Sequence, residues 1–374
     1  MDFNYTDEQN ALRDTLSRYI AKDYPFEARR ALAKSAEGFS RDHWKQFADL
    51  GLLALPFPEE FGGLSGNAVD TMLVMEAFGR GLVLEPYLAT VVVAGHLIRD
   101  AGSAAQKEAI LSAIAGGERM LALAHYEREA RYKVSLVNTA AKQDGAGWKL
   151  SGGKGVVLGG NAADTLLVTA NTGKGLSLFL VDAKSAGVAV RSYMTQDGGR
   201  AAEIALDNVA VGKDALVGPE GSALPLVERA LDYGIAALCA EAVGIMAALD
   251  EATLEYLKTR KQFGQPIGRF QALQHRMVDM VIATEQARSM AMMAAVKADS
   301  PDAAERRRAI SAAKTYIGQQ ARFVGQQAVQ LHGGMGVVDE LNVSHYFKRL
   351  TMIELTFGNT DHHLGLFSDT LLAA

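Results

Sequence analysis

The stretch RKQFGQPIGRFQ, residues 260–271, lies between two long apolar periodicities. Before it, apolar residues recur every three or four positions, which predicts a helix over about 222–260. After it, a second such pattern predicts a helix over about 270–299. Two glycines and a proline interrupt the period between the two patterns, so the stretch is predicted to connect one helix to the next.

The same stretch carries groups suited to a phosphorylated ligand. Arg260 offers a planar fork of donors that matches phosphate or carboxylate oxygens. The pattern Arg-x-Gln-Phe-Gly-x-Pro-Ile, followed by Phe-Gln, resembles the acyl-CoA dehydrogenase family. In that family this turn reaches across a subunit interface to the diphosphate of another subunit's FAD. The resemblance therefore implies FAD-binding roles for Arg260, Gln262, Phe263 and Gln271.

Length and composition limit the classes of function. The chain has 374 residues, enough for two or three domains with large cores. Its net charge of -5 gives no electrostatic basis for binding nucleic acid or an anionic membrane. No run of about 18 apolar residues is found, so no membrane span is expected. The first residues, MDFNYTDEQ, do not resemble a targeting peptide, and a cytoplasmic location is expected. The single cysteine, Cys239, excludes a disulfide framework and is expected to be a buried, inert thiol.

The order of patterns predicts three domains. Residues 1–118 read as helical, with a helix start at Thr6 and acidic residues after it. Residues 119–221 contain short apolar or alternating runs separated by Gly, Asn and Asp, which is typical of antiparallel strands. Residues 222–374 return to helix. The resemblance covers nearly the whole chain and implies a mainly α fold with a central β domain. Its parts are an N-terminal helical domain, an antiparallel β middle domain and a C-terminal four-helix bundle that forms the dimer core.

A second motif that resembles the family is QLHGGMG, residues 330–336. Three glycines after a helix allow close backbone approach to a ligand and positive φ angles, although glycine is also a common helix cap. Together with the 260–271 stretch, the resemblance implies contacts to the adenine and diphosphate end of an FAD bound mainly by a neighbouring subunit. The residues that carry these contacts are Gln330, Leu331, His332, Gly333 and Gly334.

The middle domain departs from the family at the flavin. The family normally has Thr-Glu-Pro-x-Ala-Gly-Ser-Asp, whereas this chain has YEREARYK over residues 126–133, where only Glu127 and Ala130 match. The family's Trp-Ile-x-Asn-Gly is VVLGG over residues 156–160. Small hydroxyls and glycines at the flavin edge, and an aromatic covering its ring, are therefore missing. Both changes together indicate a damaged or remodelled flavin pocket.

The catalytic base of the family is also missing. Family members remove an α-proton of an acyl-CoA thioester with a carboxylate while the flavin accepts the β-hydrogen as hydride. In most members the base is the Glu of a Tyr-Glu-Gly-Thr motif, whose position here is Phe357. A minority place the Glu on the long helix, at the position of Gly234. Neither residue can accept a proton.

Other carboxylates are weak candidates for the base. Glu354 precedes the Phe357 position by three residues, Asp361 is more simply a helix N-cap, and Glu241 is expected to be buried on the long helix. Asp232 matches an acidic residue that contacts CoA thioesters in relatives, with a solvated helix position as the alternative. No metal site is expected, because the histidines lack the spacing of common zinc motifs.

Three hypotheses follow from this partition of kept and lost motifs. The first is a degenerate small (β) subunit of a heteromeric dehydrogenase, supporting the FAD of a homologous large subunit; among such chains, this one most resembles the small subunit of pimeloyl-CoA-type dehydrogenases. The second is a complete homo-oligomeric flavoenzyme with a relocated base. The third is a non-enzymatic scaffold that binds FAD or acyl-CoA. For the first two hypotheses, the resemblance implies FAD as cofactor, an acyl-CoA substrate and an electron-transferring flavoprotein as electron acceptor.

Overall fold

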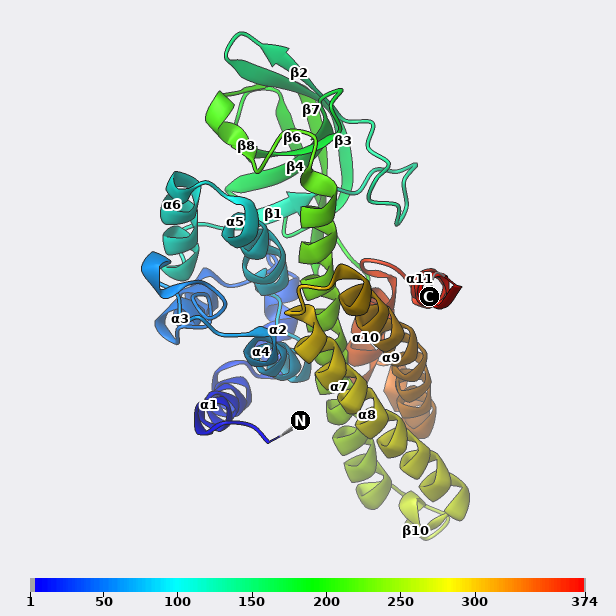
Figure 1. Cartoon of the computed structure of the whole chain (residues 1–374). Helices are drawn as coiled ribbons and strands as arrows, with labels where there is room; N and C mark the ends of the chain where they lie inside the picture. Colours follow the sequence, from blue (N-terminus) through cyan, green and yellow to red (C-terminus); the bar gives the residue numbers. More distant parts are fainter. Residues whose placement is uncertain (1–3, 373–374) are drawn as a thin grey trace. The chain divides into compact units, whose positions relative to one another are not determined.

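The computed structural model describes residues 4–372 and has helices at both ends of the chain and a sheet in the middle (Figure 1). The predicted fold class is confirmed by this element order. The chain divides into two compact units. One consists of Ala68–Val83 with the chain before Leu32 and after Gly234, and the other consists of Leu32–Asn67 and Leu84–Gly234. The domain boundaries at residues 118 and 221 stay predictions.

The first unit is helical. Its first helix starts at the predicted place, because the Thr6 side chain accepts from the backbone N–H of Gln9 while Gln9 returns a bond to the Thr6 N–H. Its elements are α1 (Asp7–Asp23), most of α2 (Phe26–Ala33), α4 (Ala68–Gly81), most of α7 (Ala223–Thr259), β9 (Lys261–Gln262), β10 (Gln265–Pro266), η4 (Ile267–Arg269), α8 (Gln271–Ala298), α9 (Ala303–His332), η5 (Gly333–Val337), α10 (Asn342–Leu355) and α11 (Thr360–Leu372). Helix α9 packs against α8, α10 and α11.

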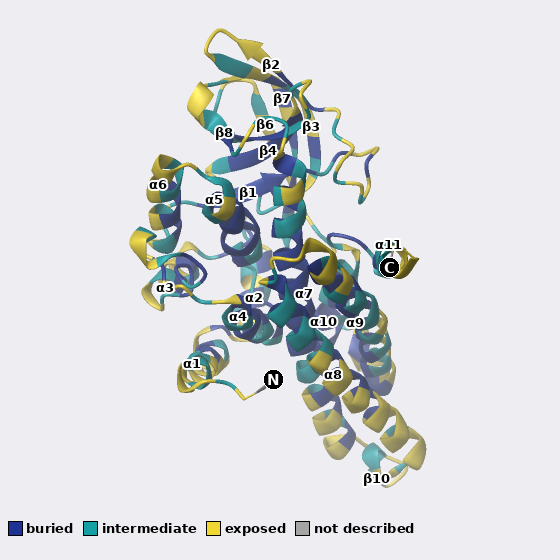
Figure 2. Ribbon diagram, in the orientation of Figure 1, coloured by how far each residue is buried: buried dark blue, intermediate teal, exposed yellow. Residues whose placement is uncertain are grey.

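Helix α7 is the central apolar helix of the chain. By length and composition it is apolar enough to cross a membrane, contrary to the expectation from the sequence, but 94% of that apolar window is buried inside the protein. Figure 2 shows long stretches of it in the colour of buried residues. The burial of Cys239 on this helix is confirmed, and burial raises the pKa of its thiol to about 12. An apolar helix covered by protein on nearly all sides needs no membrane to explain its composition.

The second unit is built on a sheet in the order β6-β7-β3-β2-β4-β5-β8, with β1 on β4. Its strands are β1 (Leu121–Ala124), β2 (Ala140–Asp144), β3 (Gly147–Leu158), β4 (Thr165–Asn171), β5 (Leu176–Asp182), β6 (Val188–Met194), β7 (Arg200–Val211) and β8 (Leu216–Val217). Most neighbours are antiparallel, as predicted, but β4 pairs in parallel with both β1 and β2. Strand β1 lies within the predicted β domain, but its four buried residues carry no signal for the direction of pairing.

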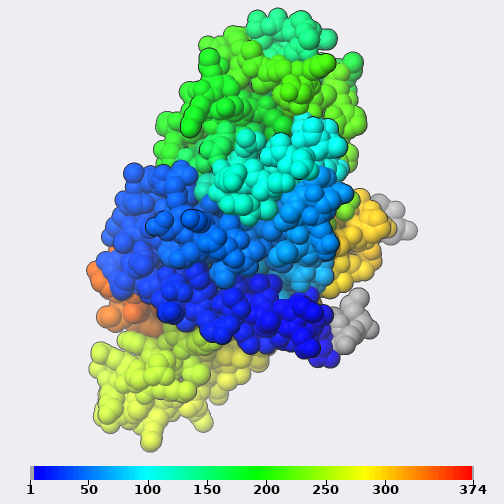
Figure 3. Space-filling model, turned by 90° about the vertical axis from the view of Figure 1, so that its left-hand side faces the viewer, coloured from blue at the N-terminus to red at the C-terminus, as the bar shows by residue number. Residues whose placement is uncertain are grey.

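The remaining elements of the second unit are α3 (Arg41–Asp49), η1 (Glu59–Phe61), η2 (Leu88–Gly95), α5 (His96–Ala101), α6 (Ala104–Ala115) and η3 (Lys213–Ala215). Within the region predicted to be helical, one helix begins as a π-helix, η2, and continues as α5. Gln106 of α6 donates to the backbone carbonyls of Asp214 and Leu216 at 2.8 and 3.1 Å. In Figure 3, cyan atoms lie beside green atoms on the face shown.

Candidate functional site

The 260–271 stretch folds as a small hairpin in the first unit. Strand β9 pairs antiparallel with β10, and the two residues between them, Phe263 and Gly264, both have positive φ angles, 55° and 77°. Positive φ at both central residues is the pattern of a type I′ turn. The connection predicted from the glycines and proline is therefore a tight hairpin, which aims its two central residues away from the helices.

The hairpin presents its predicted ligand-contacting groups to solvent. The Phe263 ring is 89% exposed and meets the Phe270 ring edge-on, with centroids 6.0 Å apart. Arg260 is exposed, and no side chain within residues 4–372 pairs with its guanidinium. Gln271, the first residue of α8, is exposed as well. Gln262 is also exposed, and its side chain donates to the carbonyl of Lys261. A large apolar ring and an unpaired guanidinium at one exposed turn fit a surface that another molecule covers.

The glycine-rich turn follows α9 in the same unit. Gly333 has a φ of 59°, and a Cβ added to Gly333 or Gly334 would meet nothing within 4 Å among the described residues. Gln330 is exposed, whereas Leu331 and His332 are buried. The structure therefore leaves the backbone of Gly333 and Gly334 open to a ligand. The side chains of Leu331 and His332 point into the protein, so these two residues can reach a ligand only through their backbone.

The two motifs lie at the same end of the helices that carry them. The imidazole of His332 stacks on Tyr256, in the last turn of α7, with centroids 4.5 Å apart. Its Nδ1 lies 2.8 Å from the Ala328 carbonyl oxygen, and burial lowers its pKa. Since α7 leads into the hairpin and α9 into the glycine-rich turn, this stack links the two motifs.

The expected position of the base is apolar and lies in a turn. Phe357 is buried, with a φ of 58°, in the turn between α10 and α11. Its carbonyl oxygen lies 3.1 Å from Nε2 of His363. Behind the turn, the buried Lys314 amine donates to the carbonyls of Ile353 and Glu354 at the end of α10. Burial lowers the pKa of Lys314 to about 8. Polar groups near this position thus maintain the turn.

The weak candidates for a base are engaged elsewhere or exposed. Glu241 is buried, and its two carboxylate oxygens accept from Arg349 at 2.6 and 2.8 Å. The Glu354 carboxylate accepts from the N–H of Thr360 at 2.9 Å. Asp361 is exposed in the first turn of α11 and is not the predicted N-cap, since the side chain of Asn359 accepts from the first turn instead.

The other two positions on the long helix fall in the second unit. Gly234, the alternative position of the base, is a buried helix residue with no side chain to act. Asp232 is also buried, so the alternative of a solvated helix position is wrong. Among residues 4–372, no group of three or more His, Cys, Asp or Glu side chains is placed to hold a metal ion.

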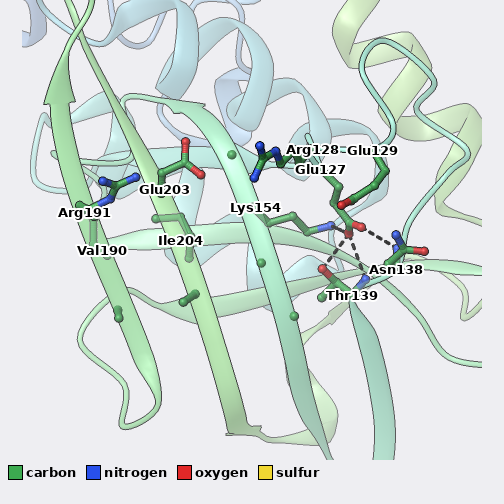
Figure 4. Close-up of a pocket in the computed structure, with 15 residues that line it drawn as sticks. Glu127, Arg128, Glu129, Asn138, Thr139, Lys154, Val190, Arg191, Glu203 and Ile204 are labelled. Atoms are coloured by element: carbon green, nitrogen blue, oxygen red, sulfur yellow. Dashed lines mark hydrogen bonds and ion pairs between the residues drawn. The ribbon is translucent and has the colours of Figure 1, made fainter.

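The second unit holds a buried ion pair that the sequence analysis does not predict. Nζ of Lys154, on β3, donates to Glu127 at 2.7 Å, and both side chains are almost fully buried. The same carboxylate accepts from the Asn138 N–H, the Thr139 N–H and the Thr139 hydroxyl (Figure 4). Both residues match the family pattern, but no local spacing indicates that they meet.

The ion pair changes the titration of both partners. Burial lowers the pKa of Lys154 to about 8, although Glu127 opposes the shift. Burial alone raises the pKa of Glu127, but the bonds from Lys154 and Thr139 outweigh it and leave this pKa below its usual value. The pair therefore anchors both ends of the segment between residues 127 and 139 to β3.

A cavity of about 600 Å³ lies beside this anchored segment. Glycines of β3 line it together with residues of β6 and β7. Arg191 and Glu203, from β6 and β7, lie on one side, and Arg128 and Glu129 of the anchored segment lie on the other (Figure 4). Its volume is in the range of small-molecule sites, roughly 300–1,000 Å³. The cavity carries charge of both signs and has no aromatic side chain among its lining residues.

The residues at the expected flavin edge differ from the family pattern, and the structure shows how they are placed. Val156, at the place of the family's aromatic, is half-exposed and has a φ of 49°. It follows Gly155, whose N–H bonds to the carbonyl of Tyr126 at 3.0 Å. Arg128, Arg131 and Lys133 are exposed around the segment. An aliphatic side chain offers less stacking area than the indole it replaces.

Comparisons with known proteins agree with the element order. Residues 6–118, 122–209 and 224–372 match the family descriptions "Acyl-CoA dehydrogenase" N-terminal, middle and C-terminal domain. The chain is 30% identical to the probable acyl-CoA dehydrogenase YngJ of Bacillus subtilis, over 96% of this chain and 97% of that protein.

Solved structures are similar over the whole chain. The ChsE4-ChsE5 complex from Mycobacterium tuberculosis is 26% identical, with a TM-score of 0.90 and full coverage of both chains. The FAD complex of PigA is 26% identical, with a TM-score of 0.91 and 99% coverage of both chains. The chain therefore belongs to the acyl-CoA dehydrogenase family of FAD-dependent oxidoreductases, which act on the CH–CH bond of acyl-CoA thioesters.

Proposed function

We propose that this chain is the degenerate small subunit of a heteromeric acyl-CoA dehydrogenase. In this assembly it supports the FAD of a homologous large subunit, which carries out α,β-dehydrogenation of an acyl-CoA. The observation that carries the proposal is the exposed hairpin with Arg260 and Phe263, linked through the Tyr256–His332 stack to the open glycine-rich turn. These groups suit the diphosphate and adenine of a dinucleotide.

The residues of the hairpin and the glycine-rich turn would suit the nucleotide end of FAD. The Arg260 guanidinium would pair with diphosphate oxygens, and the open backbone at Gly333 and Gly334 would allow the nucleotide to approach closely. Phe263 would offer a flat face for stacking. When bound, FAD supplies the hydride acceptor of the reaction. This chain would contribute binding and orientation at the nucleotide end.

A catalytic base and contacts to the flavin ring are not supplied by this chain's residues at the expected positions. Phe357 cannot accept a proton, and Gly234 has no side chain. Glu241 is neutralised by Arg349, and Glu354 caps a helix through its carboxylate. The loop over residues 126–133 lacks the small hydroxyls that would bond a flavin edge. These observations support a division of labour in which the partner supplies the base and the flavin ring site.

Oligomerisation is supported by the face of α8. Its valine and isoleucine side chains at positions 278, 281 and 282 are exposed in the single chain. A contiguous exposed apolar face on a long helix is typical of a subunit contact. We assign a homologous chain to this face, in keeping with the solved ChsE4-ChsE5 complex. The further proposals are a cytoplasmic location, a pimeloyl-CoA-type substrate bound with help from Asp232, and an electron-transferring flavoprotein as electron acceptor.

The test is purification with and without a co-expressed homologous large chain. The expected result is a colourless protein alone and a yellow complex with about one FAD shared per pair of chains, active on an acyl-CoA. A yellow, active protein from the single chain would support a complete homo-oligomeric enzyme instead. Bound acyl-CoA without flavin, in both preparations, would support a scaffold. Either of these two outcomes would overturn the proposal.

A further inference from the structure

The loop that follows the glycine-rich turn is fixed by His345, on the first turns of α10. Its Nε2 lies 2.9 Å from the Asp339 backbone oxygen and 3.2 Å from Oδ1 of the same residue. A carbonyl oxygen only accepts, so Nε2 carries a proton and donates. Ser344 adds a second tie, because its hydroxyl donates to the carbonyl of Val338 at 3.1 Å. The segment between the turn and α10 is therefore held by two neighbouring side chains.

A buried arginine lies on the other side of the imidazole. Arg29, on α2, is 2% exposed, and its Nη1 lies 3.2 Å from Nδ1 of His345. A guanidinium only donates, so Nδ1 must be the acceptor, and the imidazole must be neutral. Nε of Arg29 donates to the carbonyl of Leu82 at 3.2 Å, which fixes the guanidinium in place. The Phe26 ring and the imidazole meet edge to face, with ring centroids 5.0 Å apart.

Asp339 is also held by a side chain of α2. Nε of Arg30 bonds to its Oδ2 at 3.1 Å, and Arg30 also lies near Glu27 and Glu340. Asp339 is thus tied through its backbone to α10 and through its carboxylate to α2. At the other end of the turn, His332 is stacked on Tyr256. Gly333 and Gly334, between these two anchors, have no side chains to hold them.

We propose that His345 is a positioning residue, which, as a neutral imidazole between Arg29 and Asp339, fixes the glycine-rich turn in the arrangement that contacts the flavin nucleotide. The inference rests on the proposed function, because the turn must first contribute to a flavin site. The imidazole has no part in proton transfer to substrate. It acts through the backbone of residues 333–341.

Acid should release this anchor. Protonation of His345 places an N–H against the Arg29 guanidinium, and Lys348 adds further positive charge. Asp339 opposes this repulsion, but its carboxylate is already paired with Arg30 and is half-exposed. Burial, together with Arg29, lowers the pKa of His345 in the folded chain. A histidine with a lowered folded pKa loses its stabilising contribution as pH falls below the ordinary value, roughly 6.5.

The first experiment is hydrogen exchange of the chain alone, followed by mass spectrometry. At pH 7, His345→Ala should raise exchange of peptides over residues 333–345 by roughly tenfold, because losing the paired bonds costs about one hydrogen bond or more. His345→Gln keeps a neutral donor and acceptor and should retain most of the protection. His275→Gln is the control, because His275 is exposed on α8. Unchanged exchange in His345→Ala would overturn the inference.

A pH comparison guards against a variant that does not fold. Corrected for intrinsic rates, wild-type protection of residues 333–345 should fall between pH 7 and pH 5, and His345→Gln should show a smaller fall. Equal falls in both proteins would overturn the inference. If His345→Ala does not fold, this comparison of two folded proteins decides.

The second experiment measures FAD retention by the complex with the large chain. His345→Ala should weaken FAD retention roughly tenfold, and His345→Gln should restore most of it. If Arg260→Ala weakens retention and His345→Ala does not, the inference fails and the proposed function stands. If neither substitution changes retention, the proposed function fails. The exchange data distinguish these cases, because they do not depend on flavin.

Discussion

The imidazole of His332 stacks on the phenol ring of Tyr256, with 4.5 Å between centroids and 27° between ring planes. Each residue belongs to the last turn of its helix, α9 or α7. The contact therefore joins the helix ends that lead into the hairpin and into the glycine-rich turn. Stacked aromatic pairs contribute about 0.5–1.5 kcal/mol beyond area burial, enough to restrict how two short turns move against each other.

Arg260→Ala should weaken FAD retention by the complex about ten- to a hundredfold. Losing a charge-assisted bond to a phosphate typically costs about 1.5–3 kcal/mol. The free energy of unfolding should stay within about 0.5 kcal/mol, because the side chain is exposed. Arg322→Ala, at an exposed position of α9, is the matched control. Fluorescence of released FAD during dialysis gives the measurement, and equal retention in both variants would contradict the cross-subunit role.

Phe263→Gly should separate stability from cofactor binding. Relief of the left-handed conformation, about 1–2 kcal/mol, offsets the entropy of glycine, about 0.5–1 kcal/mol, so stability should change little. Flavin retention should nevertheless fall about five- to tenfold, because a stacking ring is lost. Phe263→Tyr keeps the ring and should retain FAD. Urea unfolding and flavin content are compared for the same preparations. Full retention by the glycine variant would show that the ring makes no flavin contact.

Glu127→Gln should destabilise the second unit by about 3–5 kcal/mol, because it leaves the Lys154 charge buried and uncompensated. The double variant Glu127→Gln with Lys154→Met should recover much of this loss, since both charges are then gone. Chemical unfolding of the two single variants and the double variant completes a mutant cycle. Strictly additive losses would mean that the two residues do not stabilise each other.

Lys314→Met should reveal the pH dependence of a buried amine. The folded pKa is about 8, below the unfolded value, so the unfolded chain binds more protons between about pH 8 and 10.5. Wild-type stability should therefore gain from this residue as pH rises through that window, by at most about 1.4 kcal/mol per pH unit. Urea unfolding at pH 8, 9 and 10 should show a less positive slope in Lys314→Met than in wild type. Parallel slopes would mean that Lys314 titrates as in the unfolded chain.

Phe357→Glu in this chain alone should not create dehydrogenase activity. A base contributes only when substrate and flavin are aligned with it, and the flavin-edge segments remain altered. The substitution also buries a carboxylate at a position of positive φ, which should lower stability. Steady-state turnover with an acyl-CoA and an artificial electron acceptor is the measurement. Turnover by the single-chain variant would show that only the base was missing.

Substitution of Glu354, Asp361 or Glu241 by the matching amide should leave most turnover of the reconstituted pair, whereas removing the partner's carboxylate should abolish it. A fall of about 10²- to 10⁴-fold in kcat, the range for loss of a general base, would show that this chain supplies the base. Glu241→Gln needs a stability measurement beside the assay, because it leaves Arg349 with a weaker partner. Its activity is therefore compared at a temperature where the variant is folded.

Part of this protein follows from the sequence alone. Helix and strand periodicities are local, so α7, α8 and the presence of strands within residues 119–221 are recognisable from the spacing of apolar residues. The break at residues 260–271 follows from glycine and proline, which restrict backbone geometry wherever they occur. That Phe357 and Gly234 cannot accept a proton is a matter of residue identity, which no fold can alter.

Other features were decided only by the tertiary structure. The pairs Glu241–Arg349, Glu127–Lys154 and Arg29–His345 join residues far apart in the chain. No local spacing predicts such pairs, because they form only after distant segments pack and exclude water. The parallel pairing of β1 with β4 likewise depends on how the chain returns to the sheet. Burial then decides the chemistry of these side chains, since charge taken out of water must find a partner or shift its pKa.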